Sequence, residues 1–506
     1  MPATTSIAAA TSLGLQRALV GVEIAVPGSA GQPPSLREMM ARIDAAVTNS
    51  GYETPAGGYT LNLASDLPAR GVGHLDLAAA IALLAASGQM PADRTRGWML
   101  IGALSLDGQV RPVRGTILFA ATAKEAGLAG IIVPEANAAE AAAIAGIDVR
   151  CAETLGEVVR FLSGQGDLRQ AEKQDGPAPG LPYRDADMSD IKGQEHVKRA
   201  LEVAAAGAHN VLMIGPPGSG KTMLAQRLQG ILPPLSEAQA LEVTAIASAA
   251  GMLGRGAGIV QVRPFRNPHP TISDAAMIGG GSTPKPGEVS LAHYGVLFLD
   301  ELAEFRRNIL DALRAPAEDG EVTLSRGGIS LSYPARFMIV AAMNPCPCGH
   351  HGDSQRRCTC APQAVQRYLG RVPGPLLGRI DLHVEVPAVR YRDLADRRAG
   401  EPSESIRGRV IRARELQHGR FAGRPDVTAN AQMSVRDMRE HCAIGEGGDA
   451  LLRTAITRLG LSARAYHRVL KIARTIADLD GAGDIATAHI SEAIQYRSLD
   501  RPNAAT

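Results

Sequence analysis

Aromatic side chains are scarce in this sequence of 506 residues: they make up 3% of it, and Trp98 is the single tryptophan. This leaves little room for a surface on which bases stack against aromatic rings, as in many proteins that grip single strands. The net charge of +2 excludes a polycation, so any contact with nucleic acid has to come from local basic loops. With 45% hydrophobic and 21% charged residues, the composition predicts a globular chain rather than a disordered one.

Long apolar runs and paired cysteines are also missing. No stretch of eighteen apolar residues occurs, so we expect no membrane-spanning helix and no membrane partner. The start of the chain lacks a basic region followed by a long apolar run, so we expect no signal peptide. Six cysteines do not make a disulfide scaffold, and four of them fall within residues 346–360, which indicates a metal site in a reducing cytoplasm.

The length predicts two to four domains. Residues 1–165 alternate strand-like and helix-like runs, which is typical of an α/β domain. Residues 166–186 are polar and contain three prolines, so we expect a linker. An α/β motor core is predicted over 187–395 and a small α-helical lid over 396–506. In the first domain the predicted strands are Ala18–Val26, Tyr59–Ala64, Trp98–Leu104 and Gly130–Val133, and the predicted helices are Leu36–Ser50, Leu75–Ala86, Leu118–Ala126 and Ala136–Ala145.

A glycine-rich turn between an apolar strand and a helix carries the strongest functional signal. The segment NVLMIGPPGSGKTMLAQRL contains the complete Walker A pattern, which binds the phosphates of ATP through backbone N–H groups. We expect Lys221 to neutralise the β and γ phosphates and Thr222 to bind Mg²⁺. A chance glycine turn is disfavoured, because the strand and the helix are both in place. The nucleotide-binding residues are Gly215, Pro216, Pro217, Gly218, Ser219, Gly220, Lys221 and Thr222.

Two further apolar strands end in polar residues that fit the same site. The run GVLFLDE ends in Asp300, expected to hold Mg²⁺ through water, and Glu301, expected to polarise the attacking water. Alternatively, these are simply exposed acids at the end of a strand. The run RFMIVAAMN ends in Asn344, which we expect to orient the same water beside the γ-phosphate. Alternatively, Asn344 only begins a turn, which the Asn-Pro pair favours.

Several segments together resemble the ComM/YifB family of Mg-chelatase-like AAA+ ATPases. They are FRNPHPTISDAAMIGGGSTPKPGEVSLAHYGVLFLDEL, ALRAPAEDGEVTLSR, AAMNPCPCG, GPLLGRIDLHVEV and LSARAYHRVLKIARTIADL. The resemblance covers essentially the whole chain and implies a homo-hexameric ring that uses ATP and Mg²⁺. The implied function is branch migration of recombining DNA during natural transformation. The implied partner is branched or single-stranded DNA, bound without dependence on its sequence.

The resemblance also assigns roles to residues outside the phosphate loop. Arg379 lies in a segment like the arginine finger of this class, which reaches the γ-phosphate of a neighbouring subunit, and Arg464 corresponds to sensor 2 of the lid. Segments Met277–Leu291 and Glu321–Tyr333 correspond to two hairpins that face a central pore. Lys285 and Arg326 would there contact the phosphate backbone of DNA. The alternatives are surface arginines and solvated turns with ordinary charges.

The amino-terminal part resembles the Lon protease fold, most closely at 102–115 and in the following ATAKEAGLAGIIVPEAN. Active Lon-type proteases use a serine activated by a lysine. The resemblance places the lysine at about Ile117 and the serine near Asp76, so both residue types are missing. We therefore expect a catalytically inactive domain used for assembly or DNA contact.

The pattern CxC-x9-CxC formed by Cys346, Cys348, Cys358 and Cys360 can close a tetrahedral Zn²⁺ site. His350 or His351 could replace one cysteine, and a reduced cluster without metal is the alternative. Zinc here would be structural and would tie down the loop after Asn344. Cys151 and Cys442 stand alone and are expected to be ordinary small residues.

Two other functions compete with the DNA motor. A magnesium-chelatase-like protein-remodelling ATPase would share the core motifs but would not need the Lon-like domain. An ATP-dependent protease is disfavoured, because the serine and the lysine are absent. A run of arginines in the lid could line a DNA path, but a solvated helix face mixed with acids is the favoured interpretation. These arginines are at positions 407, 409, 412, 414 and 420.

Overall fold

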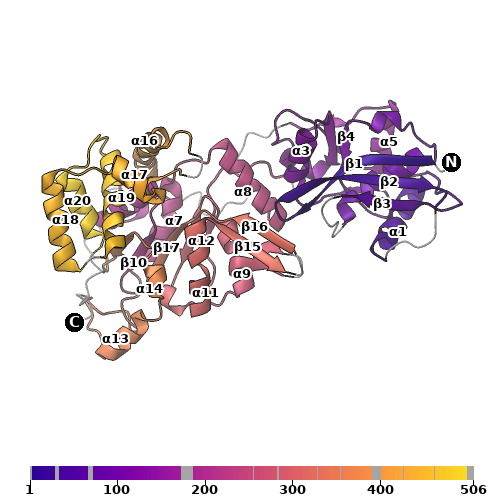
Figure 1. Ribbon diagram of the computed structural model, residues 1–506. Coiled ribbons are helices and arrows are strands. Elements are labelled where there is room, and N and C mark those ends of the chain that lie inside the picture. Colours follow the sequence, from indigo (N-terminus) through magenta and orange to yellow (C-terminus); the bar gives the residue numbers. More distant parts are fainter. Residues whose placement is uncertain are drawn as a thin grey trace.

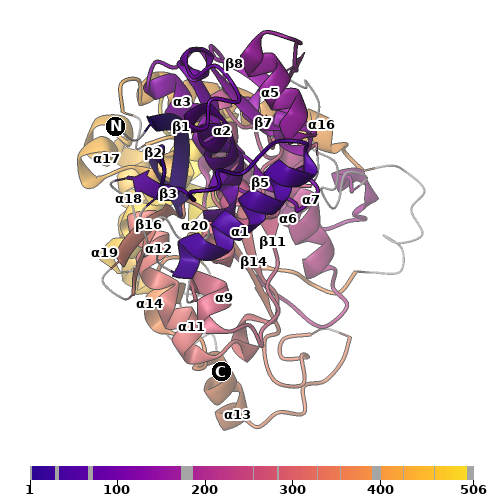
Figure 2. The ribbon, with the colours of Figure 1, turned by 90° about the vertical axis from the view of Figure 1, so that its right-hand side faces the viewer.

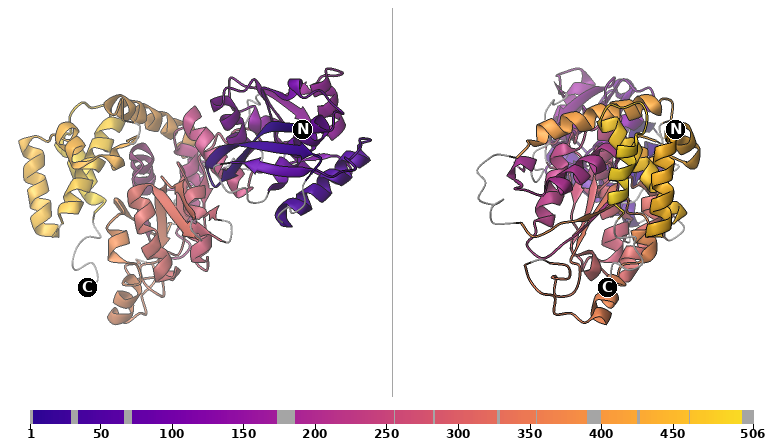
Figure 3. Two further views of the ribbon diagram at one scale, coloured as in Figure 1. Left: turned by 45° about the vertical axis from the view of Figure 1, so that its right-hand side comes forward. Right: turned by 90° about the vertical axis from the view of Figure 1, so that its left-hand side faces the viewer.

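Three blocks of secondary structure follow one another along the chain in the computed structural model (Figure 1). The structure describes residues 3–28, 34–65, 72–172, 186–254, 256–281, 284–326, 329–353, 355–389, 400–424, 427–460 and 462–497. An α/β block lies at one end, a second α/β block in the middle and a group of helices at the other end, and Figure 3 shows the same order from other sides. The predicted fold class is confirmed.

The first block is a mixed sheet with helices packed on it. In the described residues its seven strands run in the order β3-β2-β1-β4-β7-β8-β9. Buried apolar residues of β2, α2 and β7 share one core. The strands are β1 (Ala3–Leu13), β2 (Gln16–Val26), β3 (Thr60–Ala64), β4 (Trp98–Leu100), β7 (Gly130–Pro134), β8 (Asp148–Ala152) and β9 (Arg169–Gln170), and the longer helices are α1 (Pro34–Asn49), α2 (Asp76–Ala86), α3 (Thr116–Glu125) and α5 (Leu155–Ser163).

Two features of this block differ from the prediction. The central strand β1 was not predicted, because its sequence ATTSIAAATSL has few β-branched apolar residues and no clear alternation. It is held instead by an eleven-residue antiparallel register with β2 across a tight turn at Gly14, whose φ is +65°. The predicted helix Ala136–Ala145 is wrong in extent, because only Ala138–Ala141 (α4) is α-helical, after a 3₁₀ turn.

The second block contains the strands that carry the phosphate-binding motifs. Five strands of the described chain form a parallel sheet in the order β11-β14-β17-β10-β18. Because all run in one direction, the carboxyl ends of β10, β14 and β17 meet at one edge. The elements are β10 (Val211–Ile214), β11 (Phe265–Arg266), β14 (Val296–Leu299), β17 (Met338–Met343) and β18 (Leu382–Glu385), with helices α6 (Glu195–Gly207), α7 (Lys221–Ile231) and α8 (Glu237–Ala250).

The third block consists of helices that continue the core of the second. Val469 and Ile490 of this block belong to the same buried cluster as Val211 and Val384 of the sheet. No helix in the described parts of the chain combines the length and the apolar character needed to cross a bilayer. The helices are α16 (Ser403–Arg420), α17 (Val435–His441), α18 (Glu446–Leu459), α19 (Ala463–Leu479) and α20 (Thr487–Gln495).

Three of the five arginines of α16 form ion pairs or hydrogen bonds with other elements rather than lying on a free face. The fully buried carboxylate of Asp478 accepts from Arg420 at 2.6 Å, and Asn430 also donates to it at 2.8 Å. Arg409 pairs with Glu202 and Glu401, and Arg414 donates to two backbone carbonyls. The favoured prediction of a solvated helix face is therefore wrong for Arg414 and Arg420, whereas Arg409 is only half-buried and the arginines at 407 and 412 are exposed.

The first and second blocks meet where α3 packs against α8 (Figure 1), and Figure 2 shows the first block in front of the other two. Ile117 and Leu118 of α3 share a small buried cluster with Ala240 and Ile259 of the core. At its edge the buried carboxylate of Glu140 accepts the backbone N–H of Ile117 at 3.0 Å, the Ser248 hydroxyl and the Asn137 amide. Burial raises the pKa of Glu140, although these donors oppose the shift.

Replacing Glu140 by alanine should loosen this contact. Three buried donors would lose their acceptor, at a cost of about 2–4 kcal/mol. Trp98 is the single tryptophan and lies in β4 of the first block, so its fluorescence reports unfolding there. We expect Glu140→Ala to lower the urea midpoint of Trp98 fluorescence and to speed tryptic cleavage between the blocks. The exposed Glu38→Ala is the control, and an unchanged midpoint for Glu140→Ala would contradict the assignment.

Candidate active site

The glycine-rich segment forms a loop between β10 and α7 at the carboxyl edge of the second sheet. Gly218 and Gly220 have φ values of +75° and +88°, which glycine adopts without strain. A Cβ added at Gly215 would lie 2.0 Å from the carbonyl oxygen of Val386, the residue after β18. Only glycine allows the two backbones to approach so closely. The first N–H groups of α7 therefore open toward the loop, which is the arrangement that binds phosphate.

The ammonium group of Lys221 lies at the centre of the site. It is buried and donates to the carbonyl oxygens of Gly215 and Pro216 at 2.8 and 2.9 Å. It also donates to the Asn344 side-chain oxygen at 3.2 Å. Burial lowers the pKa of Lys221, and the nearby carboxylates of Asp300 and Glu301 oppose the shift. The lysine thus joins the glycine-rich loop to the end of β17.

The two acids that follow β14 lie beside the start of α7. The Thr222 hydroxyl donates to the Asp300 carboxylate at 2.7 Å, so the two expected magnesium ligands are in direct contact. Asp300 also accepts the backbone N–H of Glu301 at 2.9 Å. Glu301 is exposed and has a left-handed backbone with φ +53°, an unfavourable conformation for this residue type that is concentrated at functional sites.

The structure therefore brings Lys221, Thr222, Asp300, Glu301 and Asn344 together at one edge of the sheet. The start of α7 is surrounded by four kinds of group: the Lys221 ammonium, the Thr222 hydroxyl paired with the Asp300 carboxylate, the exposed Glu301 carboxylate and the Asn344 amide. This set can bind a triphosphate, hold a divalent cation through the hydroxyl and the carboxylate, and position a water molecule for attack.

The two expected arginines lie differently. Arg464 begins α19 and lines a cavity of about 880 Å³ together with Gly215 and Pro216. Arg379 pairs with Glu318 and lines another cavity, of about 1000 Å³, which Arg464 also borders. The structure thus places Arg464 near the glycine-rich loop, whereas Arg379 lies at the amino edge of the sheet, where its carbonyl oxygen accepts the side-chain amide of Asn210, the residue before β10.

Gln194 is a residue of this site that the sequence motifs did not reveal. Its side-chain amide donates to the carbonyl oxygens of Ser219 at 2.9 Å and of Pro387 at 3.0 Å. These two hydrogen bonds connect the glycine-rich loop to the segment that follows β18. Its φ of +58° is again unfavourable for a non-glycine residue. The only local signal is its position after Gly193, just before α6.

The two segments predicted as hairpins both contain antiparallel strand pairs. The first has β12 (Gly279–Gly280) and β13 (Lys285–Pro286), and Lys285 is exposed. The second has β15 (Glu321–Arg326) and β16 (Ile329–Pro334), and the side chain of Arg326 lies outside the described residues. Tyr333 joins them, because its buried hydroxyl donates to the Pro284 carbonyl oxygen at 3.1 Å.

The second hairpin also touches the first block of the chain. Tyr333 and Leu331 form a buried cluster with Leu13 at the end of β1. An added Cβ at Gly14 would lie 2.6 Å from the Tyr333 hydroxyl oxygen, so the β1–β2 turn lies directly on this ring. The hairpins are therefore in contact with each other and with the amino-terminal sheet.

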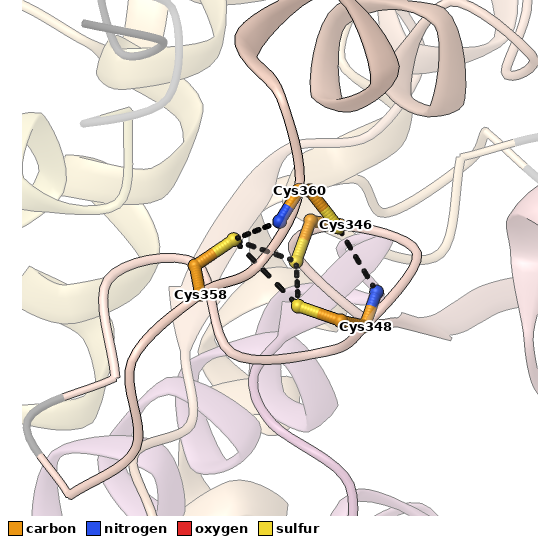
Figure 4. Close-up of side chains that lie close together, drawn as sticks. All are labelled: Cys346, Cys348, Cys358 and Cys360. Carbon is orange, nitrogen blue, oxygen red and sulfur yellow. Dashed lines mark hydrogen bonds between the residues drawn. The ribbon is translucent and has the colours of Figure 1, made fainter.

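The four clustered cysteines lie close together after the end of β17 (Figure 4). Their sulfur atoms all lie within 4.8 Å of one another. His350 is engaged with Asp353 at 3.0 Å, and His351 lines the 880 Å³ cavity, so neither belongs to the cluster. Cys151 and Cys442 are buried singly, away from this group.

Comparison with known proteins identifies the family. The family model for magnesium chelatase, subunit ChlI, matches residues 187–394, and its C-terminal model matches residues 400–497. A further model, described as subunit ChlI of Mg-chelatase, matches residues 24–137. The protein YifB of Salmonella typhimurium is 46% identical over 473 residues, which cover 92% of this chain and 90% of YifB. Competence protein ComM of Haemophilus influenzae is 42% identical over 505 residues, 97% of this chain and 96% of ComM.

This chain belongs to the ComM/YifB family of Mg-chelatase-like proteins. The expectation from the sequence motifs is thereby confirmed. The Magnesium-chelatase 38 kDa subunit of Rhodobacter capsulatus is a more distant relative, 29% identical over 329 residues that cover 60% of this chain and 84% of the subunit. Membership of a Mg-chelatase-like family implies an ATPase that uses ATP and Mg²⁺.

In this ComM/YifB chain, the positions compared with the Lon serine and lysine have structural contacts. Asp76 is buried and pairs with Arg42 at 3.0 Å, and it also accepts the Leu104 N–H. Burial raises the pKa of Asp76, while Arg42 opposes the shift. Ile117 is buried in the contact between α3 and α8. Both side chains pack or pair inside the protein.

Two substitutions separate nucleotide binding from hydrolysis. Lys221→Ala removes the buried cation and should abolish both Mg·ATP binding and turnover. Glu301→Gln keeps the size and position of the exposed side chain but not its charge, so ATP should still bind while turnover falls by about 10²–10⁴-fold. Calorimetric ATP titration and phosphate release measure the two effects. Full turnover by Glu301→Gln would exclude Glu301 as the water-activating acid.

Proposed function

We propose that this ComM/YifB-family chain is an ATP-driven motor that acts on DNA. It works as a homo-hexameric ring and migrates branch points during recombination of transforming DNA. The single observation that carries the motor is the gathering of Lys221, Asp300, Glu301 and Asn344 beside one glycine-rich loop. The relation to DNA is supported by 42% identity to a protein named a competence protein, across 97% of the chain.

In this proposal each residue of the site has one role. The segment Gly215–Thr222 holds the phosphates, and Thr222 and Asp300 hold Mg²⁺. Glu301 polarises the attacking water and Asn344 orients it. Arg464 reaches the nucleotide of its own subunit from the lid. ATP and Mg²⁺ are the cofactors at this site, and one Zn²⁺ ion is the cofactor among the four cysteines.

The proposed finger role of Arg379 is supported by its place at the amino edge of the sheet, away from the glycine-rich loop. A guanidinium there can complete the site of the next subunit in a ring and contribute about 10³–10⁵ in rate. Its contact with Glu318 would then exchange for the neighbour's γ-phosphate. A motor built this way is inactive as a monomer.

The DNA contacts are proposed to come from the two joined hairpins. Lys285 is exposed on the first, and Arg326 ends the first strand of the second. Contacts of this kind bind phosphates without reading bases, which suits a motor that moves along any sequence.

The second candidate is a protein-remodelling motor like the magnesium chelatase ATPase. Identity to the Rhodobacter capsulatus 38 kDa subunit supports it, but at 29% and over only 60% of this chain. The first sheet packs on α8 and on the second hairpin. A turnover that rises with a chelatase partner subunit and not with DNA would favour this candidate.

Mixing two inactive variants tests the ring and the arginine finger together. Lys221→Ala destroys a subunit's own site, and Arg379→Ala destroys the site of its neighbour. If Arg379 acts across subunits, an equal mixture should regain up to roughly a quarter of wild-type turnover, because half the sites keep Lys221 and half of their neighbours keep Arg379. Phosphate release after reassembly measures this gain. A mixture no more active than either variant alone would contradict action between subunits.

Branched DNA tests the proposed substrate. A four-way junction should raise ATP turnover and be resolved by the wild type but not by Lys221→Ala or Glu301→Gln. Lys285→Ala should weaken junction binding alike for all sequences and reduce its dependence on salt. Lys124→Ala, an exposed lysine of the first block, is the matched control. If junctions neither bind the wild type nor change its turnover, the DNA motor is excluded.

A further inference from the structure

We propose that Cys346, Cys348, Cys358 and Cys360 bind one Zn²⁺ ion in a zinc loop, residues 346–360, that braces the glycine-rich phosphate loop. ATP binding would then depend on a metal that lies outside the ATP site. The second half of this inference rests on the proposed ATPase function, whereas zinc binding itself does not.

The spacing of the sulfur atoms fits a single tetrahedral ion. The sulfur atoms of Cys346 and Cys348 are 3.4 Å apart. The sulfur atom of Cys358 lies 3.7 Å from that of Cys346 and 3.6 Å from that of Cys348. A tetrahedron with zinc–sulfur bonds of about 2.3 Å has sulfur–sulfur edges of about 3.8 Å. A disulfide would require about 2.0 Å. Three of the sulfurs therefore lie at about the separation that one Zn²⁺ ion requires, the Cys360 sulfur lies within 4.8 Å of each of them, and none of the four is paired in a disulfide.

The surroundings of the thiols also suit a metal. The backbone N–H of Cys348 donates to the Cys360 sulfur, and that of Cys360 to the Cys358 sulfur, each at 3.4 Å. Such bonds orient the sulfur ligands and stabilise their negative charge. Four thiolates select a soft ion such as Zn²⁺ over Mg²⁺. With four protein ligands no position is left for water, so the site is structural.

The zinc loop has almost no core of its own. None of the described residues from His350 to Ala364 is buried, and the next buried side chains are Val365 and Tyr368 of α13 (Pro362–Leu369). A segment that buries so little apolar surface cannot offset the entropy of its own ordering. A metal ion supplies the missing stabilisation, as it does in small zinc-dependent modules.

The zinc loop rests directly on the phosphate loop. Gly349, in the tight turn closed by its N–H bond to the Cys346 carbonyl, has a φ of +84°. A Cβ added to it would lie 2.5 Å from the Cδ of Pro217, so this turn and the phosphate loop are in van der Waals contact. His351 and Asp353 line the same cavity as Gly215 and Pro216. Loss of the metal would therefore remove the contact between Gly349 and Pro217 that supports the phosphate loop.

The other end of the zinc loop supports Asn344. Cys346 follows Asn344 by two residues, and Cys360 leads straight into α13. The Tyr368 hydroxyl on α13 interacts with the Asn344 backbone. Asn344 is thus connected to the metal site in two ways, through the chain to Cys346 and through α13 from Cys360. These connections keep the Asn344 side chain in contact with Lys221.

The first experiment measures metal in the full-length chain. Elemental analysis after dialysis should give one zinc per chain, and Co²⁺ substitution should produce the absorption of tetrahedral thiolate coordination. The double variant Cys358→Ser with Cys360→Ser should lose both signals. Cys151→Ser is the control, because a hydroxyl preserves the bond that the Cys151 thiol donates to Arg169. Wild-type protein with no stoichiometric zinc and no cobalt spectrum would overturn the metal site.

The second experiment measures Mg·ATP affinity with and without the metal. We expect the double variant to bind ATP about 10–100-fold more weakly, because a loop displaced by an ångström loses much of its fit to the phosphates. Should that variant fail to fold, zinc is removed from the wild type with a mercurial thiol reagent in the presence of Mg²⁺. Dithiothreitol and Zn²⁺ should then restore binding.

The outcomes separate this inference from the proposed function. Normal ATP affinity in zinc-free protein would overturn the coupling, even if the metal site is real. Absence of ATP binding in zinc-loaded wild type would instead refute the ATPase, and the zinc content would stand unaffected. Recovery of affinity on return of Zn²⁺, but not of Mg²⁺ alone, is the result that supports the coupling.

Discussion

The position of β10 in the second sheet is the constraint on which the nucleotide site depends. β10 lies between β17 and β18 in parallel register, with Val211 opposite both Val340 and Leu382. Since all three strands end at one edge, the glycine-rich loop, Asn344 and the segment after β18 are forced into contact. Val211 packs in one core cluster and Leu212 in another, so a shift by one residue would disrupt the packing on both faces of the sheet.

Much of this site could be predicted because its residues follow strand ends in short local patterns. Lys221 and Thr222 lie within one motif, and Asp300 and Asn344 each come directly after a continuous apolar run. Parallel strands place such ends on one edge of the sheet, and the motifs are expected there without knowledge of the sheet; their direct contact depends on β14, β17 and β10 being neighbours. The four cysteines were predictable for the same reason, since all of them fall within one short segment.

Features that depend on distant partners could not be predicted. β1 has a weak strand sequence, and its pairing with β2 and β4 decides its conformation. Arg414 looks like a surface residue in the sequence but donates to carbonyls of α6 and of a later loop. Glu140 and Ser248 meet across 108 positions of sequence, and Gln194 acquires its role only where the glycine-rich loop folds over it. No local pattern encodes these contacts.

The amino-terminal block contacts the second block along a continuous line, from Glu140 against Ser248 on α8 to Leu13 against Tyr333 in the second hairpin, because Leu15 packs on both clusters. A contact of this extent resists rotation of one block on the other. The block therefore gives the hairpin torsional stiffness. In the proposed motor, a stroke of the hairpin along DNA would have to carry the block with it or slide over the β1–β2 turn.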